Sequence, residues 1–325
     1  MDHRRPGHVL HQPLITRREF LQTKWETNQN ISATAYSLRV CRCCFSAYDI
    51  WCSPRRLMPF NFIFVLDLLM FENKIKTLTA RGDVALGVGM PDASEILAKL
   101  SVDTGVDFLW IDLEHRPYGV NEVKNLPLIA RRQGCMPMIR VPGLDPMYIK
   151  KALDIGANTI MVPQINNAEE ARLAVQYAKY PPQGTRGVSP DWVIYLDYSF
   201  DDYLPYANEE TAIVAQIESP EGIENIEAIA AVEGIDVVFA GPMDLSASLG
   251  VIGQLQHPEL QKLLADFPKR VAKANKPAGI TFGDLDRCRQ AIDEGYRFVN
   301  IGSIASLGAN GIRTVLPELR ERARK

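Results

Sequence analysis

The sequence lacks the features that mark membrane, secreted or nucleic-acid-binding proteins. Its longest apolar run, residues 60–71, contains Asn61 and Asp67, whereas a membrane helix needs about 20 apolar residues. Only Cys135 and Cys288 lie beyond residue 52, so no disulfide framework holds the main body. The formal net charge of −3 provides no basic face for phosphate backbones. We therefore expect a cytoplasmic protein with neither a membrane nor a nucleic acid as its partner.

Nucleotide-binding motifs are also missing. The segment Gly87-Val-Gly89 lacks the third glycine of a dinucleotide fingerprint, and no phosphate-binding G-x-x-x-x-G-K-[ST] loop occurs. The sequence therefore gives no support to a nucleotide cofactor.

Residues 1–69 differ from the rest of the chain because they show no sustained helical or strand periodicity. Cys41, Cys43, Cys44 and Cys52 raise the alternative of a zinc site, but they lack the paired C-x2-4-C spacing of zinc knuckles. We interpret this segment as a disordered extension or the result of a misassigned start codon, with Met70 as a candidate start. It is expected to be dispensable for folding and activity.

Residues 70–325 alternate short β-branched apolar runs with amphipathic helical stretches, the signature of parallel strands joined by helical crossovers. Helices are expected at Ala93–Leu100, Ala168–Lys179 and Gly222–Val232, and one long irregular stretch at residues 180–210, either a functional loop or an interface. The fold class is therefore α/β, a single (β/α)8 barrel domain of about the usual 250 residues. Its eight strands are expected at Val84–Val88, Phe108–Asp112, Pro137–Val141, Thr159–Pro163, Ala212–Ile217, Asp236–Ala240, Ala278–Phe282 and Phe298–Ile301.

Polar residues gather where four of these strands end. In barrel enzymes the catalytic groups lie at the carboxyl ends of the strands. Glu218 and Asp244 follow two neighbouring strands, and their hard carboxylate oxygens suit Mg²⁺ or Mn²⁺. The alternative is that each carboxylate only caps the helix that follows it. Gln216 shares the face of Glu218 because side chains along a strand repeat with a period of two, so it is expected to contact the substrate or the ligand carboxylate.

His115 and Arg140 are the other candidates at these ends. The ordinary pKa of histidine, about 6.5, suits a proton carrier at neutral pH, and Asp112 and Glu114 are near enough in sequence to orient His115. The permanent charge of Arg140 suits a carboxylate or a developing enolate oxygen. The alternatives are a hydrogen-bonded surface histidine and a salt bridge at the barrel rim. No lysine stands at a strand end to form a Schiff base, which favours a metal Lewis acid.

Several motifs in order resemble the HpcH/HpaI aldolase family, over roughly residues 70–313. They are Trp110-Ile-Asp-Leu-Glu-His115, Ile139-Arg-Val-Pro142, Tyr180-Pro-Pro-Gln-Gly-Thr-Arg-Gly187, Gln216-Ile-Glu218 and Gly241-Pro-Met-Asp-Leu-Ser246. The resemblance implies a class II pyruvate aldolase that cleaves a 4-hydroxy-2-oxo acid into pyruvate and an aldehyde. The implied cofactor is a divalent metal, Mg²⁺ or Mn²⁺ with Co²⁺ or Zn²⁺ as alternatives, and the implied assembly is a homo-oligomer, a hexamer.

The resemblance also implies a role for individual residues. The metal ligands would be Glu218 and Asp244, the acid/base group His115, the residue that stabilises the enolate Arg140 and a substrate contact Gln216. Asp154 would raise the basicity of the histidine, and backbone N–H groups around Met243 would hold the pyruvate carboxylate.

Two positions depart from the family pattern. Met243 and Arg116 stand where smaller residues are usual, which leaves the identity of the substrate open. An acyl-CoA lyase of the citrate lyase β type and a barrel that binds a keto acid without turning it over are the alternative functions.

Overall fold

The computed structural model describes residues 72–196 and 199–324. The expectations for residues 1–69, including the cysteines Cys41, Cys43, Cys44 and Cys52, lie outside these residues. Among the residues described, no helix is both long and apolar enough to cross a bilayer.

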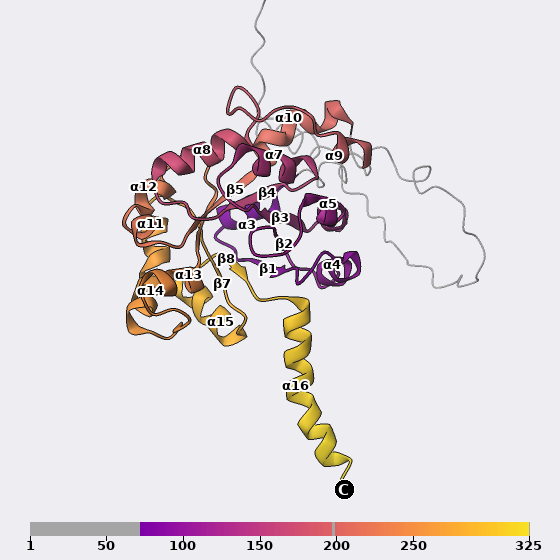
Figure 1. Ribbon diagram of the computed structural model, residues 1–325, viewed down its shortest axis with the longest axis vertical. Coiled ribbons are helices and arrows are strands. Elements are labelled where there is room, and N and C mark those ends of the chain that lie inside the picture. The colour runs from indigo at the N-terminus through magenta and orange to yellow at the C-terminus, as the bar shows by residue number, and fades with distance from the viewer. Residues whose placement is uncertain (1–71, 197–198, 325) are drawn as a thin grey trace, which may run out of the picture. The chain divides into compact units, whose positions relative to one another are not determined.

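Eight parallel strands close into a barrel in which each strand pairs with the next and β8 pairs with β1 (Figure 1). This confirms the predicted fold class, and each predicted strand is found within one or two residues of its expected bounds. The strands are β1 Ala85–Gly89, β2 Phe108–Asp112, β3 Met136–Arg140, β4 Thr159–Val162, β5 Ala212–Ile217, β6 Val237–Ala240, β7 Ala278–Thr281 and β8 Phe298–Asn300.

Most of the helices surround the strands, as in other barrels of this class. Two regions differ from the sequence-based expectation. The stretch at 180–210 is not irregular throughout, since α9 and α10 lie within it, and the helix expected at Gly222–Val232 is divided into α11 and α12 at Asn225. The helices are α3 Lys74–Ala80, α4 Glu95–Val102, α5 Val120–Val123, α6 Leu126–Arg132, α7 Pro146–Asp154, α8 Ala168–Ala178, α9 Asp191–Leu196, α10 Phe200–Glu210, α11 Pro220–Glu224, α12 Ile226–Ala230, α13 Pro242–Ser248, α14 Pro258–Ala272, α15 Leu285–Glu294 and α16 Ile304–Arg322.

Large side chains fill the inside of the barrel, so it is a packed core and not a channel. The rings of Phe108 and Phe298 stack with centroids 4.1 Å apart, and Phe239 meets Phe298 edge-on. Gly87 leaves room for this stack, since a Cβ at that position would lie 2.2 Å from the ring of Phe108. A second, larger apolar layer lies between the strands and the surrounding helices.

Helix α3 packs at the amino end of the barrel. Its Ile75 is fully buried among the interior side chains. The side chain of Asn73, which caps α3, donates hydrogen bonds to the carbonyl oxygens of Asn158 and Glu210 at 3.0 and 2.9 Å. Because this end is covered, the carboxyl ends of the strands are the side of the barrel that is left for a substrate.

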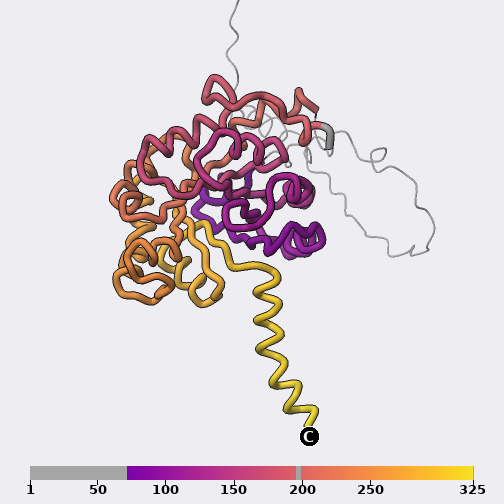
Figure 2. Tube along the Cα trace, in the orientation of Figure 1, coloured from indigo at the N-terminus to yellow at the C-terminus, as the bar shows by residue number. Residues whose placement is uncertain are grey.

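Helix α16 is different from the other long helices. It leaves the barrel after β8 and extends away from it, as the yellow segment of Figure 2 shows, and none of its residues is buried. Its apolar side chains Ile312, Val315, Leu316 and Leu319 are all exposed. A helix with an exposed apolar stripe is typical of a surface that another chain covers.

Candidate active site

A cavity of about 270 Å³ opens at the carboxyl ends of the strands. It is lined by Glu114, His115, Gln164, Asn166, Glu218, Ser219 and Asp244. Three of the residues predicted from the sequence, His115, Glu218 and Asp244, therefore lie around one cavity. Gln164, Asn166 and Ser219 were not predicted. The rule that selected the others, polar residues just beyond a strand, would have found Gln164 if it had been applied to β4.

Glu218 is held in place by neighbours on both sides. Its Oε1 accepts a hydrogen bond from the backbone N–H of Gln164 at 3.0 Å, and its Oε2 accepts one from Nε2 of Gln216 at 2.9 Å. Gln164 has a φ of 56°, an uncommon value for a residue other than glycine. In this backbone conformation its N–H group donates to the carboxylate of Glu218. Gly241 makes room for the carboxylate, because a Cβ there would lie 2.8 Å from Oε2 of Glu218.

Neither carboxylate serves as the N-cap of the helix that follows it. The N-cap of α11 is Ser219, whose side chain accepts a hydrogen bond from the N–H of Gly222, and the N-cap of α13 is Gly241, which has no side chain to do so. Glu218 is therefore free to serve the cavity. Asp244 is exposed in the first turn of α13, where the helix dipole favours a negative charge.

The charge around Glu218 is unfavourable in the absence of a cation. Burial of its carboxyl group and the negative charges of Asp244 and Glu114 raise the pKa of Glu218 to about 8. Burial is also the largest cause that raises the pKa of Glu114, and the negative charges of Asp112 and Asp244 raise it further. Two hard carboxylates, from Glu218 and Asp244, in a cavity with excess negative charge are a donor set that fits Mg²⁺ or Mn²⁺.

Arg140 is fixed by acidic residues from the neighbouring strand. Its Nε and Nη2 donate to the two oxygens of Asp112 at 2.9 and 2.7 Å, and its Nη1 lies 3.0 Å from Oε2 of Glu114. Burial alone would raise the pKa of Asp112, but the hydrogen bonds and charge of Arg140 lower it below the ordinary value. The rim salt bridge considered as the alternative role of Arg140 therefore exists, and Nη1 of Arg140 lies 3.5 Å from Oε1 of Gln216. A guanidinium held in this way is positioned for a developing negative charge.

His115 stands at the open side of the cavity, with 58% of its side chain exposed. Its Nε2 lies 3.6 Å from Oε2 of Glu114, and its backbone N–H, like that of Glu114, donates to Oδ1 of Asp112. Asp112 thus holds the turn as well as Arg140. An imidazole that is accessible and has a carboxylate beside it can exchange protons with a bound molecule.

Comparison with known proteins agrees with this geometry. Residues 86–310 match the family model described as HpcH/HpaI aldolase/citrate lyase. The chain belongs to this family. Membership of the HpcH/HpaI family confirms the resemblance found in the sequence, and with it the assignment of the chain to the aldolases.

This chain matches individual members of the HpcH/HpaI family over most of their length. The hydroxypyruvate/pyruvate aldolase of Roseobacter denitrificans is 37% identical over 232 residues, which cover 70% of this chain and 90% of that protein. The 4-hydroxy-2-oxovalerate aldolase of Novosphingobium aromaticivorans is 37% identical over 255 residues, 77% of this chain and 95% of that protein. A crystal structure of a family protein from Burkholderia cenocepacia, 32% identical, superimposes with a TM-score of 0.71 and covers 76% of this chain and 99% of that one.

Asp154 and Met243, also predicted from the sequence, are not among the residues that line this cavity. Asp154 is the last residue of α7, at the end of that helix nearest the start of β4, and its Oδ1 accepts a hydrogen bond from Nη2 of Arg186 at 2.6 Å. No hydrogen bond or ion pair joins Asp154 to His115 among the interactions of residues 72–196 and 199–324. Met243 is at the mouth, in the first turn of α13, with 53% of its surface exposed.

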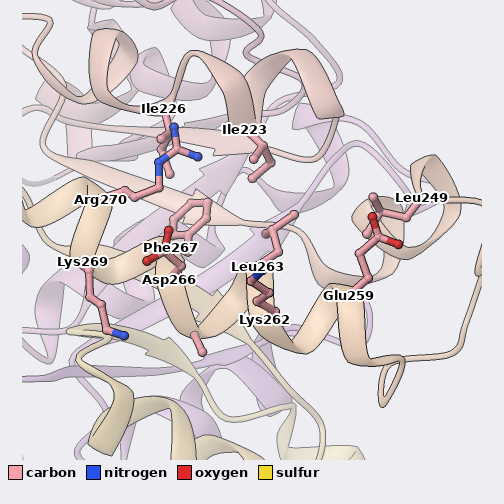
Figure 3. Close-up of a pocket in the computed structure, with 11 residues that line it drawn as sticks. Ile223, Ile226, Leu249, Glu259, Lys262, Leu263, Asp266, Phe267, Lys269 and Arg270 are labelled. Carbon is pink, nitrogen blue, oxygen red and sulfur yellow. The ribbon is translucent and has the colours of Figure 1, made fainter.

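A larger cavity, of about 610 Å³, lies in the outer layer of helices (Figure 3). Its walls come from α11 and α12 on one side and α14 on the other, with Leu249 at one end. The charged residues around it, such as Glu259 and Lys262, belong to exposed helix surfaces and do not converge on one point. Barrel enzymes work at the strand ends, so the smaller cavity is the candidate active site.

Proposed function

We propose that this protein is a metal-dependent pyruvate aldolase, which reversibly cleaves a 4-hydroxy-2-oxo acid into pyruvate and an aldehyde. The observation that carries the proposal is the convergence of Glu218, Asp244, His115 and Arg140 at one end of the barrel. The names of the family relatives, which are aldolases for hydroxypyruvate, pyruvate and 4-hydroxy-2-oxovalerate, support this class of substrate.

The metal would be held by Glu218 and Asp244, with Mg²⁺ or Mn²⁺ favoured and Co²⁺ or Zn²⁺ as alternatives. The described residues contain no group of three or more histidine, cysteine or acidic side chains placed to hold an ion, so water and the 2-oxo acid would supply the remaining ligands. When bound, the ion polarises the keto group and stabilises negative charge on its oxygen. In the part of the chain described, no lysine ends a strand, and a Schiff base has no candidate residue.

The side chains divide the remaining work. His115 accepts the proton of the 4-hydroxyl group as the bond between C3 and C4 breaks, and the aldehyde leaves. The electron pair of that bond remains with the pyruvate half as its enolate, whose oxygen lies near the guanidinium of Arg140. Return of the proton to C3 gives pyruvate. Gln216 would contact the substrate, and the backbone N–H groups at Met243 and Asp244, in the first turn of α13, would hold its carboxylate.

The test is the exchange of pyruvate methyl protons in deuterated water, with and without Mn²⁺, beside aldol cleavage. Glu218→Gln and Asp244→Asn should abolish both, whereas Glu221→Gln, an exposed acidic residue three positions further along, should change neither. Activity that survives chelation and dialysis, or inactivation by borohydride with pyruvate, would overturn the proposal. Binding of pyruvate without exchange would favour a non-catalytic keto-acid-binding barrel, and turnover only of acyl-CoA substrates a lyase of the citrate lyase β type.

We propose further that the protein is a homo-oligomer, with a hexamer expected from the family. The exposed apolar side chains of α16, which its own barrel does not cover, support this. Val315→Asp combined with Leu319→Asp should lower the mass measured by light scattering, and Thr314→Asp on the same helix should not. An unchanged mass in the double variant would remove α16 from the interface.

Asp154 lies at the opposite end of the barrel from His115, so it would have to act on the histidine of a neighbouring subunit.

A cytoplasmic location is also proposed. Cys135 and Cys288 are buried free thiols, which agrees with a reducing compartment.

A further inference from the structure

The side chain of Asn166 joins two loops at the carboxyl ends of the neighbouring strands β4 and β5. Its Nδ2 donates a hydrogen bond to the carbonyl oxygen of Gln164 at 2.8 Å, within the loop that follows β4. Its Oδ1 accepts a hydrogen bond from the hydroxyl group of Ser219, the residue that caps α11 after β5. One end of the amide therefore serves each loop, and none of the steps derived above uses Asn166.

The backbone of Asn166 is also fixed on both sides. Its N–H donates to Oε2 of Glu170, in the first turn of α8, at 2.7 Å. Its carbonyl oxygen accepts a hydrogen bond from Nδ2 of Asn225, between α11 and α12, at 2.9 Å. Because two further elements hold this backbone, the side chain can restrain the groups that it contacts.

The residue that needs a restraint is Gln164. Its φ of 56° lies in the left-handed region, which is unfavourable for a residue other than glycine. Its side chain is exposed, so packing does not hold it there. Hydrogen bonds of the peptide group that follows do so instead: the carbonyl oxygen accepts from Asn166, and the N–H of Ile165 donates to the carbonyl oxygen of Gln216 at 3.0 Å.

We propose that Asn166 is a positioning residue for Glu218, and that it acts through the backbone of Gln164. The inference rests on the proposed metal-dependent function. In the left-handed conformation the N–H of Gln164 donates to Oε1 of Glu218 at 3.0 Å, while Nε2 of Gln216 holds Oε2. Without the amide of Asn166, Gln164 can return to the ordinary region of negative φ, and its N–H then changes direction. Binding of a metal ion would have to restore the left-handed conformation, which lowers the affinity for the ion.

The experiment measures Mn²⁺ affinity by equilibrium titration of the free ion, and pyruvate proton exchange at saturating Mn²⁺. Asn166→Ala should lower the Mn²⁺ affinity about 3-fold to 10-fold, the effect of one hydrogen bond, while the exchange rate at saturation stays within about 2-fold of the wild type. Asn167→Ala is the matched control, because the side chain of Asn167 accepts hydrogen bonds from the N–H groups of Glu169 and Glu170 as the N-cap of α8. It should lower the melting temperature and leave the Mn²⁺ affinity unchanged.

Two substitutions of Gln164 test the backbone route, and the fold should accept both because this side chain is exposed. Gln164→Val introduces a β-branched residue, for which a positive φ is rare, and it should lower the Mn²⁺ affinity at least as much as Asn166→Ala. Gln164→Asn introduces a residue type that adopts the left-handed conformation more readily. Combined with Asn166→Ala, it should recover most of the lost affinity.

Unchanged Mn²⁺ affinity in Asn166→Ala and Gln164→Val would overturn the positioning role. A loss in Asn166→Ala that Gln164→Asn does not reduce would also overturn it, and would show that Asn166 acts through Ser219 and α11. The failure of the proposed function has a separate signature. A wild-type protein that binds Mn²⁺ but exchanges no pyruvate protons would refute the aldolase, while the affinities of the variants would still decide the role of Asn166.

Discussion

Substitution of Gly241 by alanine tests the proposed metal site without altering any of its polar groups. The backbone of Gly241, with φ −97° and ψ 86°, is open to alanine, so the effect is steric. The added methyl carbon would lie 2.8 Å from Oε2 of Glu218 and 3.1 Å from Nε2 of Gln216, whereas ordinary contacts begin at 3.4 Å. The carboxylate must therefore move by about 0.6 Å, more than the roughly 0.2 Å over which metal–ligand distances vary.

We expect Gly241→Ala to reduce Mn²⁺ affinity and to slow pyruvate proton exchange by about 10-fold to 100-fold, because small misplacements of a catalytic group have effects of this size. The free energy of unfolding should fall by only about 1–3 kcal/mol, the usual cost of overpacking. Gly143→Ala is the matched control at the same end of the barrel, since a Cβ at Gly143 meets nothing within 4 Å. Full activity and unchanged Mn²⁺ affinity in Gly241→Ala would refute the assignment of Glu218 as a metal ligand.

Three further predictions concern protons and charge. His115→Ala should slow aldol cleavage by about 100-fold to 10,000-fold and leave Mn²⁺ and pyruvate binding in equilibrium titrations nearly unchanged; near-normal rates would remove His115 from the mechanism. Arg140→Lys should recover little of the activity lost in Arg140→Ala, because one ammonium cannot replace the paired contacts of 2.9 and 2.7 Å to Asp112; full recovery would show that charge alone is sufficient. Burial lowers the pKa of Lys179 to about 8, below its value of about 10.4 in the unfolded chain. Between these two pH values the unfolded state binds more protons than the folded state, so the free energy of unfolding should rise with pH from about 8 to 10.4. This rise should be missing in Lys179→Met. The free energy of unfolding would be measured by denaturant titration at several pH values for both proteins. The same dependence on pH in the wild type and in Lys179→Met would contradict the prediction.

The strands and the end of the barrel that carries the site could be predicted from the sequence, because both depend on local patterns. A parallel strand buried on both faces is a short run of apolar residues, such as Phe108–Asp112, and the residues just after such a run must lie at the carboxyl end of the sheet. This is why His115, Glu218 and Asp244 could be selected before any contact was known. The helices between residues 180 and 210 escaped prediction, because α9 has only six residues and Pro205, a helix-breaking residue type, stands inside α10.

The partners of each side chain were decided only by the tertiary structure. The sequence places Asp112 and Glu114 beside His115, but the fold joins them to Arg140 from the next strand, because β2 and β3 pair in a register that puts Asp112 opposite Arg140. Gly241 and Gln164 are distant from Glu218 in the sequence, and only the closed barrel brings them against its carboxylate. Among the described residues, Nε1 of Trp110 and Oδ1 of Asn300 are buried without a hydrogen-bond partner. No sequence pattern indicates this, because burial without a partner is a property of the packed molecule and not of any residue type.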